Sequence, residues 1–229
     1  MLKILSIIPA RGGSKGIPLK NLTLLGKKPL IYHTVKASLD SKIDRTVVST
    51  DNLKISKIAS NYGAEVILRP KKLANDKSQI EPVIKYVLDY LRKKENYVPD
   101  LVILLQNTSP LRTSKHIDKA IQFFNKNNFD SVLSGFVSHS LLWKVDKKIG
   151  KPINYDPLNR QNRQDMKSQF IENGAIYITK NKLFNETNCR VSGKIGVFEM
   201  PEESSLQIDS KHDILFAEQI LKMRKKNEK

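Results

Sequence analysis

The sequence predicts an α/β fold in which helices cover both faces of a mostly parallel sheet. Short apolar or β-branched runs alternate with amphipathic segments along most of the chain. Such alternation is typical of strands joined by right-handed crossovers, which place helices on both sides of the sheet. A chain of 229 residues is long enough for one domain of this Rossmann-like kind with a substantial core.

The elements follow in chain order from apolar runs and from helical spacing. Strands are expected at Ile4–Ile8, Arg45–Thr50, Ala64–Leu68, Leu101–Leu105, Phe129–Val137, Ala175–Thr179 and Ile195–Phe198. Helices are expected at Pro29–Leu39, Leu53–Tyr62, Ile80–Lys94, Ser114–Asn125 and His212–Met223. Pro29 suits a first helical turn, Asp51 or Asn52 can cap the second helix, and Gly63 ends it. Ser114 is expected to cap the helix that it begins.

A glycine-rich loop with several cations follows the first strand and reads PARGGSKGIPLKN over residues 9–21. Glycines allow close approach of the backbone to an anion, and consecutive N–H groups form a concave anion nest. Arg11, Lys15 and Lys20 add positive charge around it. The loop therefore predicts a polyphosphate site, and hence an enzyme that handles a nucleotide.

The spacing excludes two other phosphate loops. A Walker A loop needs lysine after its last glycine, but Gly16 is followed by Ile17 and Pro18. The dinucleotide fingerprint also fails, because no glycine stands two residues before Gly13. A flexible surface loop with incidental lysines is the alternative. A loop directly after a buried strand usually lies at the ligand-binding edge of the sheet, which favours the polyphosphate site.

Composition and charge limit the kinds of partner that the protein is expected to bind. The net charge of +17 would suit a nucleic acid, but the lysines are spread along the chain without interleaved aromatic residues. Lys222–Lys229 is interpreted as a solvated helix end. Cys189 is the only cysteine, and no apolar run has transmembrane length. We therefore expect a soluble cytoplasmic protein that binds neither nucleic acid nor membrane.

The alternating pattern weakens between residues 141 and 169. This stretch is polar, contains Pro152 and Pro157, and includes the run NRQNRQD over residues 159–165. We interpret it as an insertion into an α/β domain formed by residues 1–140 and 170–229.

Six ordered segments carry a resemblance to a known family. They read IIPARGGSKGIPLKN (7–21), VVSTD (47–51), LRPKKLANDKS (68–78), LLQNTSPLR (104–112), ENGAIYI (172–178) and IDSKHD (208–213). In these segments the chain resembles the acylneuraminate cytidylyltransferases, which include CMP-sialic acid synthetases and relatives acting on legionaminic or similar nine-carbon acid sugars. The resemblance implies transfer of CMP from CTP to the anomeric hydroxyl of such a sugar, with release of pyrophosphate. It also implies a Mg²⁺ or Mn²⁺ cofactor and a homodimer in which residues 141–169 are a dimerisation element that completes the partner's sugar site.

The resemblance assigns roles to individual residues. The implied nucleotide-binding residues are Ala10, Arg11, Gly13, Ser14, Lys15, Asn21, Arg69 and Ser78. The implied sugar-binding residues are Gln106, Thr108, Ser109, Lys144, Arg163 and Tyr177. The implied catalytic residues are Arg11, Lys15, Lys20 and Asp209, with Lys15 nearest the reacting phosphoryl group and Asp209 as the metal ligand.

Some of these assignments have competitors. An arginine suits a sugar carboxylate because its planar fork matches it in bidentate fashion, but Arg160 competes with Arg163 for that role. The assignment of Lys144 to the sugar depends on an irregular spacing around His139. Tyr177 could instead be a core aromatic residue. Arg69, which precedes Pro70, could simply end a strand.

The chain departs from the family pattern at two positions. Asn107 stands where the family commonly has proline, which questions the rigidity of that loop. Gln207 stands where the family commonly has the first of two aspartates, so only Asp209 remains of the pair. One carboxylate with phosphate oxygens and waters is still an ordinary Mg²⁺ site, and Asp213 is expected to belong to the last helix.

Three alternative functions remain open. A sugar-1-phosphate nucleotidyltransferase usually has an arginine inside its glycine run, whereas Arg11 precedes the glycines here. The cytidylyltransferase for the eight-carbon sugar Kdo resembles the first loop but not the LLQNTSPLR or ENGAIYI segments. A protein that only binds nucleotides is disfavoured by Lys15, Arg163 and Asp209. The sequence does not choose among sialic, legionaminic and pseudaminic acids.

Overall fold

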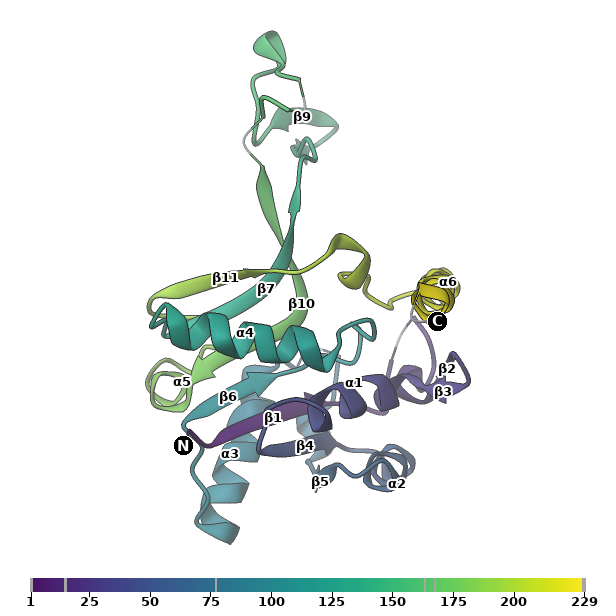
Figure 1. Cartoon of the computed structure of the whole chain (residues 1–229), viewed down its shortest axis with the longest axis vertical. Helices are drawn as coiled ribbons and strands as arrows, with labels where there is room; N and C mark the ends of the chain where they lie inside the picture. Colours follow the sequence, from purple (N-terminus) through teal and green to yellow (C-terminus); the bar gives the residue numbers. More distant parts are fainter. Residues whose placement is uncertain (1, 15, 77, 163, 167, 228–229) are drawn as a thin grey trace.

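One twisted seven-stranded sheet forms the centre of the molecule (Figure 1). The structure is a computed structural model that describes residues 2–14, 16–76, 78–162, 164–166 and 168–227. Within these ranges the strand order is β11 (Ile195–Glu199), β7 (Ser131–Ser138), β10 (Gln169–Lys180), β6 (Leu101–Leu104), β1 (Ile4–Pro9), β4 (Arg45–Thr50) and β5 (Glu65–Leu68). All neighbours pair in parallel except β10, which is antiparallel to both β6 and β7.

Helices cover both faces of this sheet, as the sequence predicts. One face packs against α1 (Leu30–Leu39), α2 (Leu53–Asn61) and α4 (Ser114–Lys126), and the other against α3 (Glu81–Glu95) and α5 (Asn181–Thr187). Two apolar cores result, because successive residues of a buried strand point to opposite faces. The α/β fold with a mostly parallel sheet is therefore confirmed. The sequence analysis missed the short helix α5.

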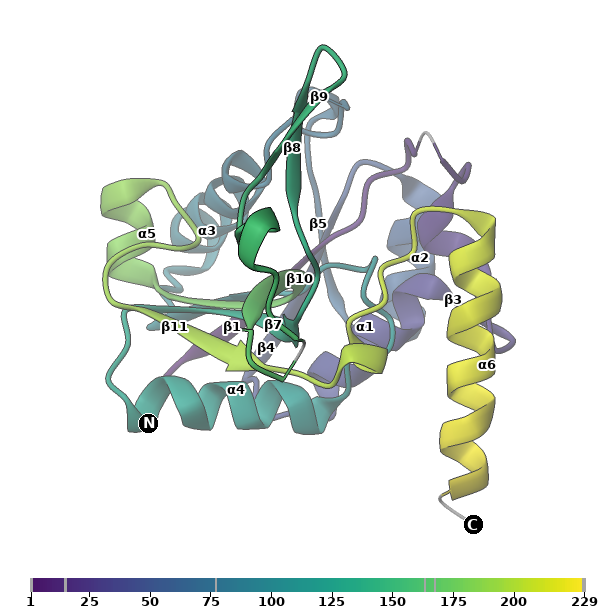
Figure 2. The same ribbon diagram turned by 90° about the horizontal axis from the view of Figure 1, so that it is seen from above.

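The last helix, α6 (Lys211–Asn227), packs away from the two main cores. It lies beside the short hairpin of β2 (Leu24–Leu25) and β3 (Lys28–Pro29) (Figure 1 and Figure 2). Short 3₁₀ turns complete the chain at Lys20–Leu22, Lys71–Leu73, Pro157–Asn159 and Glu202–Ser204. Among the described residues, no helix has both the length and the apolar character that a membrane crossing requires.

Helix caps partly follow the sequence expectations. The Asn52 side chain accepts hydrogen bonds from the backbone N–H groups of Lys54 and Ile55, so Asn52 caps α2. Ser114 is not the cap of α4. Thr113 takes that place instead, in a capping box with His116, because its hydroxyl reaches the third N–H of the helix.

A long arm rises from one edge of the domain (Figure 1). The paired strands β7 and β10 enter it at Ser138 and Gln169, and β8 (Trp143–Asp146) and β9 (Ile149–Pro152) form an antiparallel hairpin within it. The arm occupies the stretch that the sequence interprets as an insertion. The polar, proline-containing sequence did not indicate this hairpin.

Strand β10 is interrupted where it passes the carboxyl end of β6. Its register shifts between Glu172 and Tyr177, and Gly174 has φ +67° in the interruption. The side chain of Asn173 is 2% exposed and accepts from Ser134 Oγ while donating to Ser205 Oγ. A buried polar network therefore fixes the interruption, which borders the site described next.

Candidate active site

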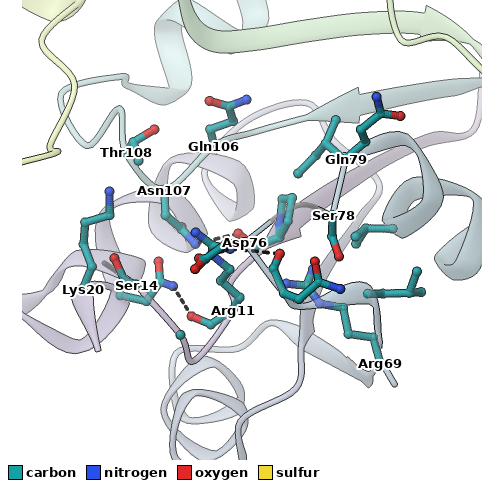
Figure 3. A pocket seen from close by; sticks show the side chains of 17 residues that line it. Arg11, Ser14, Lys20, Arg69, Asp76, Ser78, Gln79, Gln106, Asn107 and Thr108 are labelled. Carbon is teal, nitrogen blue, oxygen red and sulfur yellow. Dashed lines mark hydrogen bonds and ion pairs between the residues drawn. The ribbon is translucent and has the colours of Figure 1, made fainter. Parts of the chain in front are cut away.

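A cavity of about 290 Å³ opens at the carboxyl edge of the sheet (Figure 3). Three segments line it: the glycine-rich loop after β1, the stretch after β5 that begins with Arg69, and the loop after β6 with Gln106, Asn107 and Thr108. Ligands of open α/β sheets bind at this edge, so the location agrees with the sequence expectation.

Hydrogen bonds to the backbone of residues 10–12 hold the start of the glycine-rich loop in place. Asn21 Nδ2 donates to the carbonyl oxygen of Arg11 at 2.9 Å, and the Gly12 N–H donates to Asp51 Oδ1 at 2.9 Å. The N–H of Ala10 donates to the carbonyl of Ser49, and the Ala10 side chain is fully buried. These contacts fix the start of the loop against β4.

The same loop is joined to the segment that precedes α6. Lys20 Nζ donates to the carbonyl of Ile208 at 2.8 Å and to Asp209 Oδ1 at 3.0 Å. A Cβ added to Gly16 would lie 2.5 Å from the Asp209 carbonyl oxygen, so only glycine permits this approach. The Ile208 N–H in turn donates to the Thr108 carbonyl at 2.7 Å. Three distant parts of the sequence are therefore locked together around the cavity.

Arg11 and Asp76 form an ion pair inside the cavity (Figure 3). Arg11 Nη1 lies 3.0 Å from Asp76 Oδ1 and also donates to the Asn75 carbonyl at 3.0 Å. Both side chains are more than one-third exposed, so water screens the pair. A polyanion that enters the cavity can therefore compete for Arg11 at low cost.

Arg69 is a buried cation in the wall of the cavity. It is 7% exposed, and its Nε and Nη1 atoms have no hydrogen-bond partner among the described residues. Burial lowers its pKa, with the nearby charge of Asp51 opposing the shift and that of Arg11 adding to it. Buried donors without partners are costly, so the side chain is suited to a ligand that offers acceptors.

The loop after β6 is supported by a second buried arginine. Arg112 Nη1 donates to the carbonyl oxygens of Gln106 at 3.2 Å and Ala175 at 2.8 Å, which ties the loop to β10. Complete burial lowers the pKa of Arg112 to about 9. Ser109 is also fully buried and donates from Oγ to the Asn173 carbonyl at 3.4 Å, so its hydroxyl points into the protein.

Two glutamine side chains meet at Gly174. A Cβ added there would lie 2.8 Å from Gln106 Oε1 and 3.0 Å from Gln207 Nε2. Gln207 Nε2 also donates to the Asn173 carbonyl at 2.6 Å. Gln207 thus places a second neutral amide near that of Gln106, although Gln207 does not itself line the cavity.

Besides Asp76, two carboxylates lie close to the cavity at the start of α6, namely Asp209 and Asp213. Asp209 is 71% exposed and pairs with Lys20. Asp213 accepts from the N–H groups of Asp209 and Ser210 at the start of α6, which agrees with its expected place in the helix. Within the described residues no three metal-ligating side chains gather at one point.

Comparison with known proteins decides the family. A sequence profile described as cytidylyltransferase matches residues 5–228. The chain belongs to the cytidylyltransferase family. N-acylneuraminate cytidylyltransferase A of Danio rerio is 37% identical over 223 residues, covering 94% of this chain and 50% of the fish protein. The Streptococcus agalactiae N-acylneuraminate cytidylyltransferase is 31% identical over 221 residues, covering 93% and 52%.

The resemblance read from the sequence is thereby confirmed, while the chain spans about half the length of these relatives. Solved structures agree on the fold. CMP:2-keto-3-deoxy-manno-octonic acid synthetase complexed with CTP has a TM-score of 0.68 at 16% identity, covering 97% of this chain and 99% of that one. The 4-diphosphocytidyl-2C-methyl-D-erythritol synthase of Anaerococcus prevotii has a TM-score of 0.66 at 17% identity, covering 96% and 98%.

Most residues that the resemblance assigns to ligands in this cytidylyltransferase lie together. The predicted residues that line the cavity are Arg11, Gly13, Ser14, Lys20, Asn21, Arg69, Ser78, Gln106 and Thr108. Asp209 lies beside them through its contact with Lys20, whereas Ala10 and Ser109 are buried behind the wall. Lys15 and Arg163 lie outside the described residues. The ligand roles of all these residues remain predictions.

Besides Ser109, two predicted sugar-binding residues do not line the cavity. Lys144 lies on β8 in the arm. Tyr177 is 3% exposed within the core beneath α3, its hydroxyl donates to Glu172, and the Arg190 guanidinium lies over its ring. Burial raises the pKa of Tyr177, with the Glu172 contact as the next cause. Tyr177 therefore occupies the position of a core aromatic residue, which is the alternative given in the sequence analysis.

The sequence analysis missed Asp76 and Asn107 as cavity residues. Asp76 lies in the matched LRPKKLANDKS segment, so its presence could have been found there. Asn107 and Gln207 were noticed only as departures from the family pattern. No local signal indicates that Asn107 lines the cavity or that Gln207 lies near Gln106.

Proposed function

We propose that this cytidylyltransferase transfers CMP from CTP to the anomeric hydroxyl of a nine-carbon 2-keto acid sugar of the sialic or legionaminic type, releasing pyrophosphate. The observation that carries the proposal is the cavity, which is lined by the cationic glycine-rich loop and by Arg69, whose Nε and Nη1 atoms have no hydrogen-bond partner among the described residues. The relatives named N-acylneuraminate cytidylyltransferases support the choice of nucleotide and sugar.

In the proposed complex the cytosine base lies at the end of the cavity near Arg69, and the triphosphate lies at the end formed by the glycine-rich loop. The buried Arg69 offers N–H donors, and cytosine offers the acceptors O2 and N3 at its pairing edge. The glycine loop, with Arg11, Lys15 and Lys20, surrounds the triphosphate. The triphosphate replaces Asp76 as the partner of Arg11. A polyphosphate binds a partly exposed guanidinium more strongly than a single carboxylate does.

The reaction is an in-line displacement at the α-phosphorus. The oxygen of the anomeric hydroxyl forms a bond to this phosphorus and its proton passes to water. The bond from phosphorus to the bridging oxygen breaks, and its electron pair leaves with pyrophosphate. Negative charge then grows on the departing pyrophosphate. Fixed cations stabilise this charge without reorganisation, which is the role of Lys20 and Lys15. Lys20 is suited to it because the Ile208 carbonyl and Asp209 hold its ammonium group in place.

The residues fit a divalent cation. Asp209 offers one exposed carboxylate next to the cavity, and Mg²⁺ is commonly held by one or two carboxylates together with substrate phosphates and water. When bound, Mg²⁺ or Mn²⁺ neutralises part of the triphosphate charge. Gln207 does not replace the missing first carboxylate of the family pair, because it is a neutral amide whose nitrogen donates to the Asn173 carbonyl.

The acid sugar occupies the side of the cavity formed by β6 and β10. Gln106 and Gln207, which meet at Gly174, offer neutral amides to its hydroxyl and acyl groups. Thr108 lies on the same loop. Arg163 binds the sugar carboxylate in bidentate fashion, and Lys144 reaches the sugar from the arm; Ser109 and Tyr177 support this wall from the interior.

The arm supports a homodimer in which residues 141–169 complete the partner's sugar site. Apolar side chains that are 40–97% exposed gather on it, namely Leu142, Trp143, Val145, Ile149, Ile153 and Leu158. Such a patch on an extended arm is suited to burial against another protein surface, and a two-fold axis lets one patch serve both protomers. The single cysteine and the use of CTP suit a cytoplasmic location.

The test is pyrophosphate release with CTP, Mg²⁺ and a panel of acceptors. Release with sialic, legionaminic or pseudaminic acid, and little with Kdo or a sugar 1-phosphate, is the expected result. Equal release with a sugar 1-phosphate would overturn the proposal. Light scattering in the same buffer tests the dimer, since a fully active monomer would exclude a shared site.

A further inference from the structure

Asp76 is an acidic side chain in a cavity whose other charged residues are cations. Arg11, Lys20 and Arg69 line the same cavity, and among the described residues of its lining Asp76 is the one that carries a carboxylate. Like charges repel, so this carboxylate opposes any anion that the cations attract. Its place in the cavity therefore bears on how tightly an anion is held there.

The guanidinium of Arg11 bridges two walls of the cavity. Arg11 belongs to the loop after β1, whereas its Nη1 atom lies 3.0 Å from Asp76 Oδ1 and 3.0 Å from the Asn75 carbonyl oxygen, both in the segment after β5. Figure 3 shows Arg11 and Asp76 side by side in the cavity. Their side chains are 35% and 44% exposed, so a dissolved anion can reach the pair.

Local hydrogen bonds hold the acidic segment in front of Arg11. Asn75 Nδ2 donates to the Lys72 carbonyl at 2.9 Å, and Ser78 Oγ donates to the same carbonyl at 3.1 Å. The Ser78 N–H donates to the Asn75 carbonyl at 3.1 Å. A turn fixed on both sides of Asp76 keeps its carboxylate close to the guanidinium, which gives it a high effective concentration as a partner.

An anion that takes Arg11 as its partner must first displace Asp76. Its apparent affinity is then reduced by the fraction of molecules in which Arg11 is available. The same factor applies to every ligand that uses Arg11, so it weakens the binding of CTP and of pyrophosphate alike. For a substrate the cost is a higher KM, but for a product the same cost favours departure.

We propose that Asp76 is a built-in competitor for Arg11 that weakens the binding of pyrophosphate and so favours its release after each transfer. The proposal rests on the proposed function for the identity of this product. Asp76 acts through Arg11 and not on the reacting atoms.

The experiment titrates inorganic pyrophosphate into the full-length chain by calorimetry in the presence of Mg²⁺, with the Asp76→Asn variant in parallel. Asparagine keeps the shape of the side chain and removes its charge. We expect the Kd for pyrophosphate to fall by about 2- to 5-fold in the variant, the range that an exposed ion pair contributes. The KM for CTP should fall by a similar factor, and pyrophosphate should inhibit the transfer reaction at correspondingly lower concentration.

The Arg11→Gln background distinguishes competition for Arg11 from a general effect of charge. Both pyrophosphate affinities are measured again in Arg11→Gln and in the double variant Arg11→Gln/Asp76→Asn, which completes a double-mutant cycle. Without the guanidinium, removal of the carboxylate should change the Kd by less than about 1.5-fold. An equal gain in both backgrounds would overturn the proposal, because Asp76 would then act on the anion directly. An unchanged Kd in Asp76→Asn alone would overturn it as well.

Asp40→Asn is the matched control for the change in net charge. Asp40 also pairs with an exposed cation, Lys36, at 2.6 Å, but it lies at the end of α1 and does not line this cavity. Its replacement should leave the Kd for pyrophosphate unchanged, and a gain equal to that of Asp76→Asn would contradict the proposal.

The binding measurements need no acceptor sugar, so they separate this proposal from the proposed function. Tighter pyrophosphate binding in Asp76→Asn that depends on Arg11 supports the competitor role even if no acid sugar is turned over. Absence of transfer would then count against the proposed function alone.

Discussion

Replacement of Gly174 by alanine tests how the sugar side of the cavity is built. Gly174 has φ +67°, a conformation that costs an L-residue about 1–2 kcal/mol. The new Cβ would also lie 2.8 Å from Gln106 Oε1 and 3.0 Å from Gln207 Nε2, so both amides must move. Loss of their hydrogen bonds to the sugar would cost about 1–2 kcal/mol together, which is about 5- to 30-fold in KM.

The assay measures initial rates of pyrophosphate release while the sugar and CTP are varied separately. We expect Gly174→Ala to raise the sugar KM by that factor and the CTP KM by less than about 2-fold, since the displaced amides lie on the sugar side in the proposed arrangement. Thermal unfolding should show a decrease in Tm of roughly 2–8 °C, because the positive φ alone destabilises the folded state of the variant.

Gly26→Ala is the matched control for the backbone cost. Gly26 has φ +58°, and its added Cβ would only touch Leu221 Cδ1 at 3.6 Å. It should lower Tm by a similar amount while leaving both KM values unchanged. If the two variants have the same sugar KM, then Gln106 and Gln207 do not bind the sugar and the reasoning is refuted.

Three further predictions concern the nucleotide, the metal and the fold. Arg69→Lys should raise the KM for CTP by about 10-fold or more, because lysine keeps the charge but loses the fork; an unchanged CTP KM in steady-state kinetics would exclude Arg69 from base recognition. Asp209→Asn should weaken Mn²⁺ binding to the complex with a non-hydrolysable CTP analogue, followed by electron paramagnetic resonance, whereas an unaltered titration would place the metal ligand elsewhere. Burial lowers the pKa of His116 to about 4, with Arg224 as the next cause, so the unfolded chain binds more protons between about pH 6.5 and 4. Stability should therefore be fully present above about pH 6.5 and decline as the pH falls toward 4, and His116→Gln should flatten that decline in denaturant titrations at several pH values; an identical decline in the variant would contradict the assignment.

The fold was predictable because local signals and topology agree in most of this chain. Apolar runs such as Leu101–Leu105 have no alternative to burial in a parallel sheet, and the glycine loop after Ile4–Ile8 can only lie at the carboxyl edge. The arm was not predictable in the same way. The β8–β9 hairpin is largely exposed and each of its strands has only four residues. Trp143 and Val145 alternate with polar residues in β8, but a pattern this short does not stand out within a polar stretch that contains prolines.

The cavity was predictable from motifs only in part. Arg11 and Lys20 stand in a glycine-rich loop whose composition and place after the first strand indicate an anion site, whereas Arg69 was assigned only by the family resemblance. The place of Gln207 depends on its contact with Asn173, 34 residues away in the sequence, and on the positive φ of Gly174. Contacts of this kind are set by tertiary packing, so a motif that names the residue cannot say where its side chain points.

The central claim is tested most directly by identifying the product formed from CTP and N-acetylneuraminic or legionaminic acid in the presence of Mg²⁺. Phosphorus-31 NMR distinguishes a phosphodiester, in which one phosphate joins cytidine to the anomeric carbon, from a nucleotide diphosphate sugar. The account predicts a single phosphodiester resonance that grows in step with free pyrophosphate. A diphosphate-linked product, or consumption of CTP with no sugar attached, would contradict it.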